Sequence, residues 1–100
     1  MTEPYTIRQI QSIVSPIARE HGVSSVALFG SYAKGKASAD SDIDLIIEKG
    51  KVRSLFQISR LRLALEDALR VPVDLITSES SDKAFLESIT KDEVLLYREA

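Results

Sequence analysis

The sequence FGSYAKGKASADSDIDL, residues 29–45, decides how this chain folds and what it can do. An apolar run ends at Gly30-Ser31, a small basic loop follows, and a second apolar run carries Asp42 and Asp44. In an extended strand, side chains two positions apart point to the same face, with their Cα atoms about 6.6 Å apart. We therefore expect Asp42 and Asp44 to share one face of a strand and Ile43 to lie on the other.

This pair of carboxylates predicts a metal site. Like charges held side by side raise each other's pKa unless a cation lies between them. Mg²⁺ is bound in proteins by one or two carboxylates together with phosphate oxygens of the substrate. The Gly30-Ser31 turn and the loop lysines, Lys34 and Lys36, would face those phosphates. The stretch therefore predicts a metal-dependent phosphate-transfer site.

A third acid lies in a later apolar run, VPVDLIT, residues 71–77. Asp74 stands between Val73 and Leu75, and an unpaired carboxylate is costly to bury, so a cation, a set of donors or a proton is expected beside it. If this strand lies beside the one with Asp42 and Asp44, the three carboxylates can hold two Mg²⁺ ions about 3.5–4 Å apart. Asp74 would then also accept the proton of an attacking hydroxyl. The alternative is that Asp74 caps a turn or pairs with an arginine.

Length and composition limit the class of protein. One hundred residues with 44% apolar content predict a single globular domain spanning residues 1–100. A net charge of -2 argues against a general nucleic-acid-binding surface. Cysteine is absent and His21 is the only histidine, which excludes disulfides, thiolate sites and His clusters. With no membrane-length apolar run and no signal peptide, we expect a cytoplasmic protein that binds neither membrane nor nucleic acid directly.

Hydrophobic periodicity predicts an α/β (α+β) chain with its elements in the order α-β-loop-β-α-β-α-β. The first helix has Thr6 as its N-cap and ends at Gly22, and Pro16 should kink or split it. The wholly apolar run before Gly30 is typical of a strand buried on both faces. The remaining predicted elements are strands over residues 23–29, 42–48, 71–77 and 94–97, helices over 54–70 and 84–89, and a possible helical turn over 31–34.

The helix over residues 54–70 carries two separate apolar groups. One is a stripe at helical spacing, expected to face the core: Ile58, Leu61, Leu65, Ala68 and Leu69. Phe56 and Leu63 fall almost opposite this stripe. They are either partly covered surface residues or a contact patch for another protein chain.

A phosphate-binding P-loop is the competing reading of the basic loop. Gly30, Gly35 and Lys36 match its first part, but the motif next requires Ser or Thr to bind Mg²⁺, and this chain has Ala37. A P-loop would also leave Asp42 and Asp44 without a role. We therefore reject it.

The combined motifs resemble a known family. Gly30-Ser31, ten intervening residues and Asp42-Ile43-Asp44 match the G-S-x10-D-x-D signature of the polymerase-beta-like nucleotidyltransferases. Within that superfamily, LFGSYAKGKA, SDIDL and the later VDLIT are similar to the minimal nucleotidyltransferase (MNT) family, and the resemblance covers residues 7–97. The family usually has Arg where this chain has Lys34, which keeps the charge but loses the bidentate fork.

This resemblance implies the nucleotidyltransferase fold, a small mixed β-sheet flanked by helices. It also implies an Mg²⁺-dependent nucleotidyltransferase with ATP as substrate. Gly30, Ser31 and Lys34 would bind the nucleotide phosphates, Asp42 and Asp44 would bind both metal ions, and Asp74 would be the third carboxylate. Proteins of this family typically pair with HEPN-domain ribonuclease toxins, and some act as antitoxins by transferring AMP to a tyrosine of that partner. Two alternatives stay open: a small-molecule or RNA acceptor, and a non-catalytic antitoxin that occludes its toxin.

Overall fold

The computed structural model describes residues 4–79 and 82–99. The secondary-structure elements follow the predicted order, and the expected helical turn after Gly30 is a short helix, α2. The elements are α1 (Ile7–His21), β1 (Ser25–Phe29), α2 (Gly30–Ala33), β2 (Ile43–Glu48), α3 (Leu55–Leu69), β3 (Val73–Thr77), α4 (Lys83–Thr90) and β4 (Val94–Arg98).

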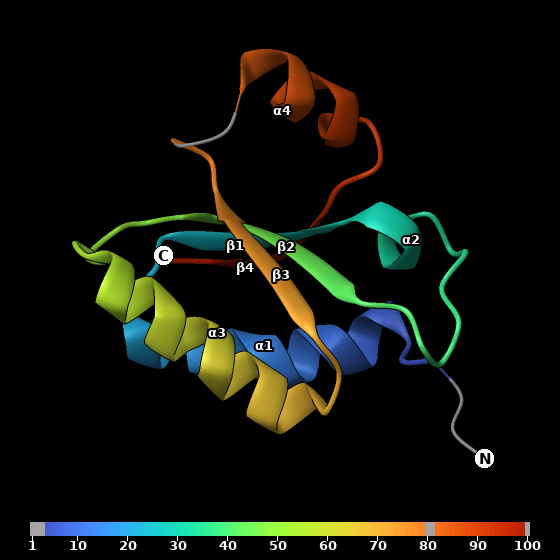
Figure 1. Ribbon diagram of the computed structural model, residues 1–100, viewed down its shortest axis with the longest axis horizontal. Helices are drawn as coiled ribbons and strands as arrows, with labels where there is room; N and C mark the ends of the chain where they lie inside the picture. Colours follow the sequence, from blue (N-terminus) through green and yellow to red (C-terminus); the bar gives the residue numbers. More distant parts are fainter. Residues whose placement is uncertain (1–3, 80–81, 100) are drawn as a thin grey trace.

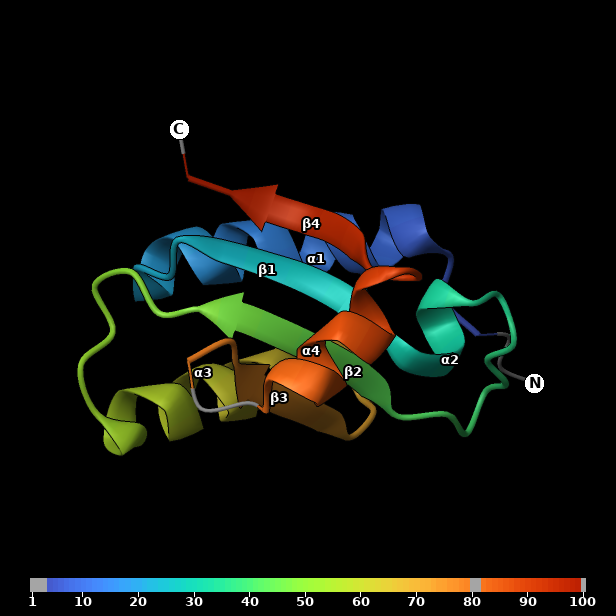
Figure 2. The same ribbon diagram turned by 90° about the horizontal axis from the view of Figure 1, so that it is seen from above.

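A four-stranded mixed sheet in the order β3-β2-β1-β4 forms the centre of the molecule. β1 is antiparallel to both β2 and β4, whereas β2 and β3 are parallel, joined through α3. Helices α1 and α3 cover one face of the sheet and α4 lies on the other (Figures 1 and 2). The predicted fold class is confirmed. Pro72 comes directly before the edge strand β3, where its missing N–H costs no hydrogen bond in the sheet.

Both long helices begin with a capping box. The Thr6 and Ser54 hydroxyls accept hydrogen bonds from the backbone N–H groups of Gln9 and Gln57, whose side chains bond back to the cap residues. α1 ends at Gly22, which has a φ of 79°. It is one continuous helix, so the predicted alternative of a split at Pro16 is wrong.

The burial of α1 explains why it continues through proline. Ile10, Val14 and Ala18 are fully buried on one side, while Pro16 is exposed. Packing of this apolar face against the core outweighs the hydrogen bond that proline removes.

The main core lies between the sheet and the helices α1 and α3. Ile43, Leu45 and Ile47 of β2 are fully buried and point into this core, as the alternation predicts. All five residues of β1 are buried, which confirms a strand covered on both faces. From α3, fully buried positions are Leu61, Leu65 and Leu69, with Ile58 packed at the margin.

Ala68 is exposed, so its place in the predicted stripe is wrong. The buried residues of α3 repeat every four positions, and Ala68 lies beside this narrower row.

A second, smaller apolar cluster comprises Ala27, Phe29 and Ile46 of the sheet, with Ile76, Leu86 and Ile89 packed against it. In the part of the chain that the structure describes, no helix has both the length and the apolar character needed to cross a membrane.

Candidate active site

Asp44 and Asp74 lie side by side on the sheet face that carries α4. The backbone register pairs Asp44 of β2 with Phe29 of β1 on one side and with Asp74 of β3 on the other. Neighbouring strands lie about 4.8 Å apart, so the carboxylates of Asp44 and Asp74 extend from adjacent backbones on the same face. Asp42 lies one residue before β2. The predicted adjacency of the strands that carry the acids is confirmed.

Gly30 lies directly against the carboxylate of Asp44. Its φ of 74° is left-handed, a conformation that residues with a side chain rarely adopt. A Cβ at this position would overlap the Oδ2 of Asp44 and lie 3.0 Å from its Cγ. The turn at Gly30-Ser31 and the acidic strand therefore fit together only if residue 30 has no side chain.

The pKa of Asp44 is raised because the carboxyl is partly buried, and the nearby charges of Asp74 and Asp42 raise it further. A bound cation would relieve this repulsion. The donor set consists of carboxylate oxygens, which suits Mg²⁺. Among residues 4–79 and 82–99, however, no three acidic or histidine side chains are close enough to form a complete metal site. The carboxylate oxygens are of the kind that Mg²⁺ binds, but such an ion would need further ligands, for example phosphate oxygens of a substrate.

The raised pKa predicts that Asp44→Asn stabilises the metal-free protein. The folded state holds the Asp44 proton more tightly than the unfolded chain does, so ionising Asp44 lowers the free energy of unfolding. This loss is absent below the ordinary aspartate pKa and grows as the pH rises through the raised pKa of the folded state. Without divalent cations, we expect a gain in melting temperature of about 1–3 °C at neutral pH that disappears at acidic pH. Circular dichroism melts across this range measure it, with Asp67→Asn on α3 as a control that shows no comparable gain. A neutral-pH melting temperature below that of the wild type would contradict the interpretation.

Asp74 is exposed, which corrects the expectation of a carboxylate buried within an apolar strand. β3 is an edge strand, and the face on which Asp74 lies is covered only in part by α4. The ion pairs in the described part of the chain, Lys49–Glu79 and Arg62–Glu66, do not involve Asp74. The alternative of an arginine partner therefore has no support, and solvation accounts for the charge without a metal.

The predicted phosphate-binding residues Ser31 and Lys34 lie on α2 and at its end, and a loop connects this helix to β2. Tyr32 is 4% exposed and anchors α2 in the core, while Ser31 is half-buried and Lys34 is exposed at the end of the helix. The Ser38 N–H donates to the Ser41 Oγ at 2.8 Å, directly before Asp42. Lys34 is thus free to reach toward a ligand, whereas the backbone at Gly30-Ser31 is held in place.

Sequence reasoning missed two residues near the site. Tyr32 lies within the predicted helical turn over residues 31–34, but no role was predicted for it, although a large aromatic residue in a short turn is a signal for a buried anchor. Phe85 of α4 packs edge-on against Phe29, the register partner of Asp44, with ring centroids 6.0 Å apart. Nothing in the sequence indicates that α4 lies over the acids, because that placement depends on the whole sheet.

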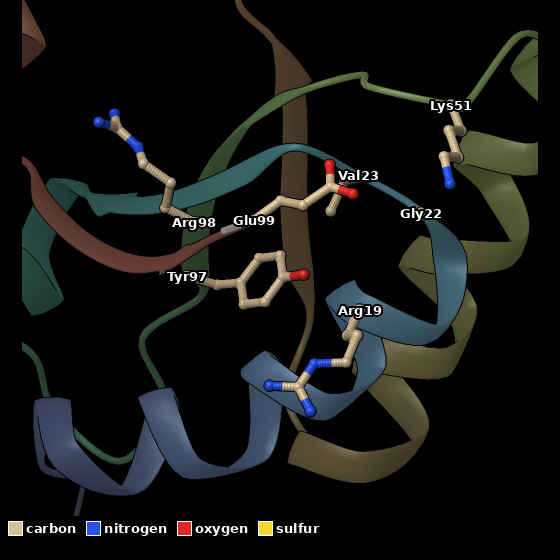
Figure 3. Close-up of a pocket in the computed structure, with 7 residues that line it drawn as sticks. All are labelled: Arg19, Gly22, Val23, Lys51, Tyr97, Arg98 and Glu99. Atoms are coloured by element: carbon tan, nitrogen blue, oxygen red, sulfur yellow. The ribbon is translucent and has the colours of Figure 1, made fainter.

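A pocket of about 410 Å³ lies at the opposite end of the sheet from the acids. Figure 3 shows Tyr97 near the centre of this pocket, with Arg19 below it, the Glu99 carboxylate above it and Lys51 farther to the right. Its lining includes none of the predicted site residues. It is therefore separate from the candidate active site.

The chain is similar to two curated relatives over most of their length. The chain is 36% identical over 89 residues to "Putative protein adenylyltransferase MJ0435" of Methanocaldococcus jannaschii, covering 89% of this chain and 90% of that protein. It is 30% identical over 93 residues to "Protein adenylyltransferase MntA" of Thermococcus cleftensis, covering 89% and 94%.

Solved structures share the fold. A structure described as a putative minimal nucleotidyltransferase superposes with a TM-score of 0.77 at 34% identity, over 89% of this chain and 91% of that one. An MNT antitoxin complex with a tri-AMPylated HEPN toxin from Shewanella oneidensis gives 0.72 at 19% identity, over 93% and 73%, a likeness of fold alone. The family described as "Polymerase beta, Nucleotidyltransferase" matches residues 11–100. This chain belongs to the polymerase beta nucleotidyltransferase family.

Proposed function

We propose that this protein is an Mg²⁺-dependent adenylyltransferase that moves AMP from ATP to a tyrosine hydroxyl of a HEPN-domain toxin and so acts as its antitoxin. The observation that carries the proposal is the row formed by Gly30, Asp44 and Asp74, a side-chain-free turn beside acids on adjacent strands. The adenylyltransferase names of the relatives and the AMPylated toxin bound to an MNT antitoxin support the donor and the partner.

Each site residue has a role in this proposal. Asp42 and Asp44 would hold two Mg²⁺ ions, with Asp74 as the third carboxylate. When bound, these ions would neutralise the phosphate charge and stabilise the developing negative charge. Gly30 and Ser31 would contact the outer phosphates of ATP, because the absence of a side chain at residue 30 leaves the backbone open to them.

The reaction is a displacement at phosphorus. The acceptor oxygen forms a bond to the α-phosphorus of ATP, and the bond from that phosphorus to the oxygen bridging to the β-phosphate breaks. Pyrophosphate leaves, and Asp74 accepts the proton of the acceptor hydroxyl. The protein's contribution is mainly positioning and charge stabilisation, to which Lys34 would add a positive charge beside the leaving pyrophosphate.

Lys34→Ala is expected to lower kcat/KM for ATP about tenfold or more, because one charge-assisted contact to a phosphate is lost. Lys34→Arg keeps the positive charge and should stay within about threefold of the wild type. Steady-state assays of pyrophosphate release with a saturating partner measure both variants. Equal activity of Lys34→Ala and wild type would remove Lys34 from the site.

The proposed acceptor is a hydroxyl of another protein, which needs a surface of this chain on which to dock. The two residues of the predicted contact patch are exposed, Phe56 at 72% and Leu63 at 57%, with Leu55 beside them at 81%. This patch lies on α3, on the sheet face opposite α4 and the acids (Figure 1). A partner docked there must also extend around the sheet to present a hydroxyl to Asp44.

The test of the proposal is intact-mass spectrometry of a co-purified HEPN partner incubated with this protein, ATP and Mg²⁺. We expect mass gains on the partner in steps of one AMP. A modified metabolite or RNA with an unmodified partner would instead identify a different acceptor.

The distance of the patch from the acids favours one second candidate, neutralisation by occlusion without catalysis. In that case Phe56→Ser with Leu63→Ser would abolish both the complex and the neutralisation of the toxin, while Asp42→Asn with Asp44→Asn would leave both intact. Loss of neutralisation in the Asn variant, with the complex preserved, would exclude occlusion as the mechanism.

A further inference from the structure

Helix α4 places an aromatic ring beside the acids. Phe85 is 41% exposed, and its ring meets that of Phe29 at an interplanar angle of 87°, an edge-to-face contact. Leu86 and Ile89 of the same helix pack into the small cluster under α4. The cluster anchors the helix on the sheet, and Phe85 remains partly open to solvent.

The position of this ring relative to the acids follows from the register. Phe29 is the partner of Asp44 across β1 and β2, and Asp44 is the partner of Asp74 across β2 and β3. Phe29, Asp44 and Asp74 thus form one row across the sheet on one face. Phe85 packs against Phe29 at one end of this row, and Figure 2 shows α4 over these strands. A ligand whose phosphates contact the Gly30-Ser31 turn beside Asp44 thus has an exposed aromatic surface on the same face of the sheet.

We propose that Phe85 supplies the surface on which the nucleobase of the bound nucleoside triphosphate stacks; this rests on the proposed function of the acids. A ring held by an edge-on neighbour has little freedom to lose when a base covers it. Stacking accepts any base, because every base has a π-face. Phe85 therefore contributes affinity for the base, with little discrimination between ATP and GTP. The Ser88 hydroxyl, one turn further along α4, donates its hydrogen bond to the Phe85 carbonyl at 2.6 Å.

Titration calorimetry with Mg²⁺ tests this proposal by comparing ATP, GTP and inorganic tripolyphosphate, which has the phosphates but no base. Phe85→Leu keeps apolar bulk against Phe29 and removes the ring, and Phe85→Tyr keeps the ring. We expect Phe85→Leu to weaken ATP and GTP about tenfold and leave tripolyphosphate unchanged, with Phe85→Tyr within about twofold of wild type. Leu95→Ala, at an apolar side chain of β4 that is 48% exposed and has no part in the proposed site, is the control and should leave all three affinities unchanged.

Three results would overturn the proposal. Equal weakening of ATP and tripolyphosphate would show that Phe85 supports the fold of the site rather than the base. Unchanged ATP binding in Phe85→Leu would place the base elsewhere. Wild-type protein that binds ATP no better than tripolyphosphate would show that no base is held. Because these are binding measurements, base-dependent affinity without AMP transfer would overturn the proposed function and leave the role of Phe85 standing.

Discussion

The double substitution Asp42→Asn with Asp44→Asn is expected to lower the rate of AMP transfer by at least about 10³-fold. In the proposed site both carboxylates would hold the metal ions, and metal ions contribute several kcal/mol to the stabilisation of charge in such reactions. Asparagine keeps the shape and one oxygen of each side chain but removes both negative charges. Single-turnover assays with the partner in excess measure the chemical step and leave out product release.

The double variant should remain folded. Asp42 is exposed, and Asp44 is ionised at neutral pH only at a cost in stability, so neither charge is needed for folding. A melting temperature at or above that of the wild type would confirm that lost activity is a defect in chemistry. Wild-type transfer rates in this variant would contradict the assignment of these acids.

Gly30→Ala is expected to reduce transfer at least about 100-fold and to destabilise the protein by about 2–4 kcal/mol. Two effects combine in this variant. The left-handed φ of residue 30 costs roughly 1–3 kcal/mol for a residue with a side chain. The new Cβ also overlaps the Asp44 carboxylate, which must move, and a displacement of about 1 Å at a reacting centre can cost 10²-fold in rate.

Gly35→Ala separates these two effects. Gly35 has a φ of 72°, close to that of Gly30, but no heavy atom lies within 4 Å of the position a Cβ would take. We expect Gly35→Ala to lose stability through backbone strain alone, about 1–2 kcal/mol in denaturant titrations, and to keep transfer activity within about threefold. Equal loss of activity in Gly30→Ala and Gly35→Ala would show that backbone strain, and not the contact with Asp44, explains the requirement for glycine at residue 30.

The sequence predicted the elements well because their signals are local. Apolar periodicity located the helices and strands, and capping residues such as Thr6 and Ser54 marked the helix starts. The adjacency of β2 and β3, which the sequence analysis stated as a condition, is found in the structure, since two strands joined by a helix usually form a parallel pair. The ends of strands were less accurate: β1 begins at Ser25 and β3 at Val73, because pairing starts only where a neighbouring strand is present.

The remaining features depend on contacts between distant segments. That Asp74 is exposed follows from the edge position of β3, and a sequence does not state which strand ends a sheet. Pro16 stays within α1 because the core holds the helix on both sides of it. The approach of Gly30 to Asp44 and the packing of Phe85 on Phe29 each join residues from different elements. Local periodicity carries no information about either contact.

The most direct test of the central claim follows the phosphorus of ATP. This protein and a HEPN partner are incubated with Mg²⁺ and ATP labelled either at the α-phosphate or at the γ-phosphate. The proposed reaction predicts that the partner gains label from α-labelled ATP and none from γ-labelled ATP, with no labelling by the Asp42/Asp44 double Asn variant. Label from the γ-phosphate, or no label despite full neutralisation of the toxin, would contradict nucleotidyl transfer to that partner.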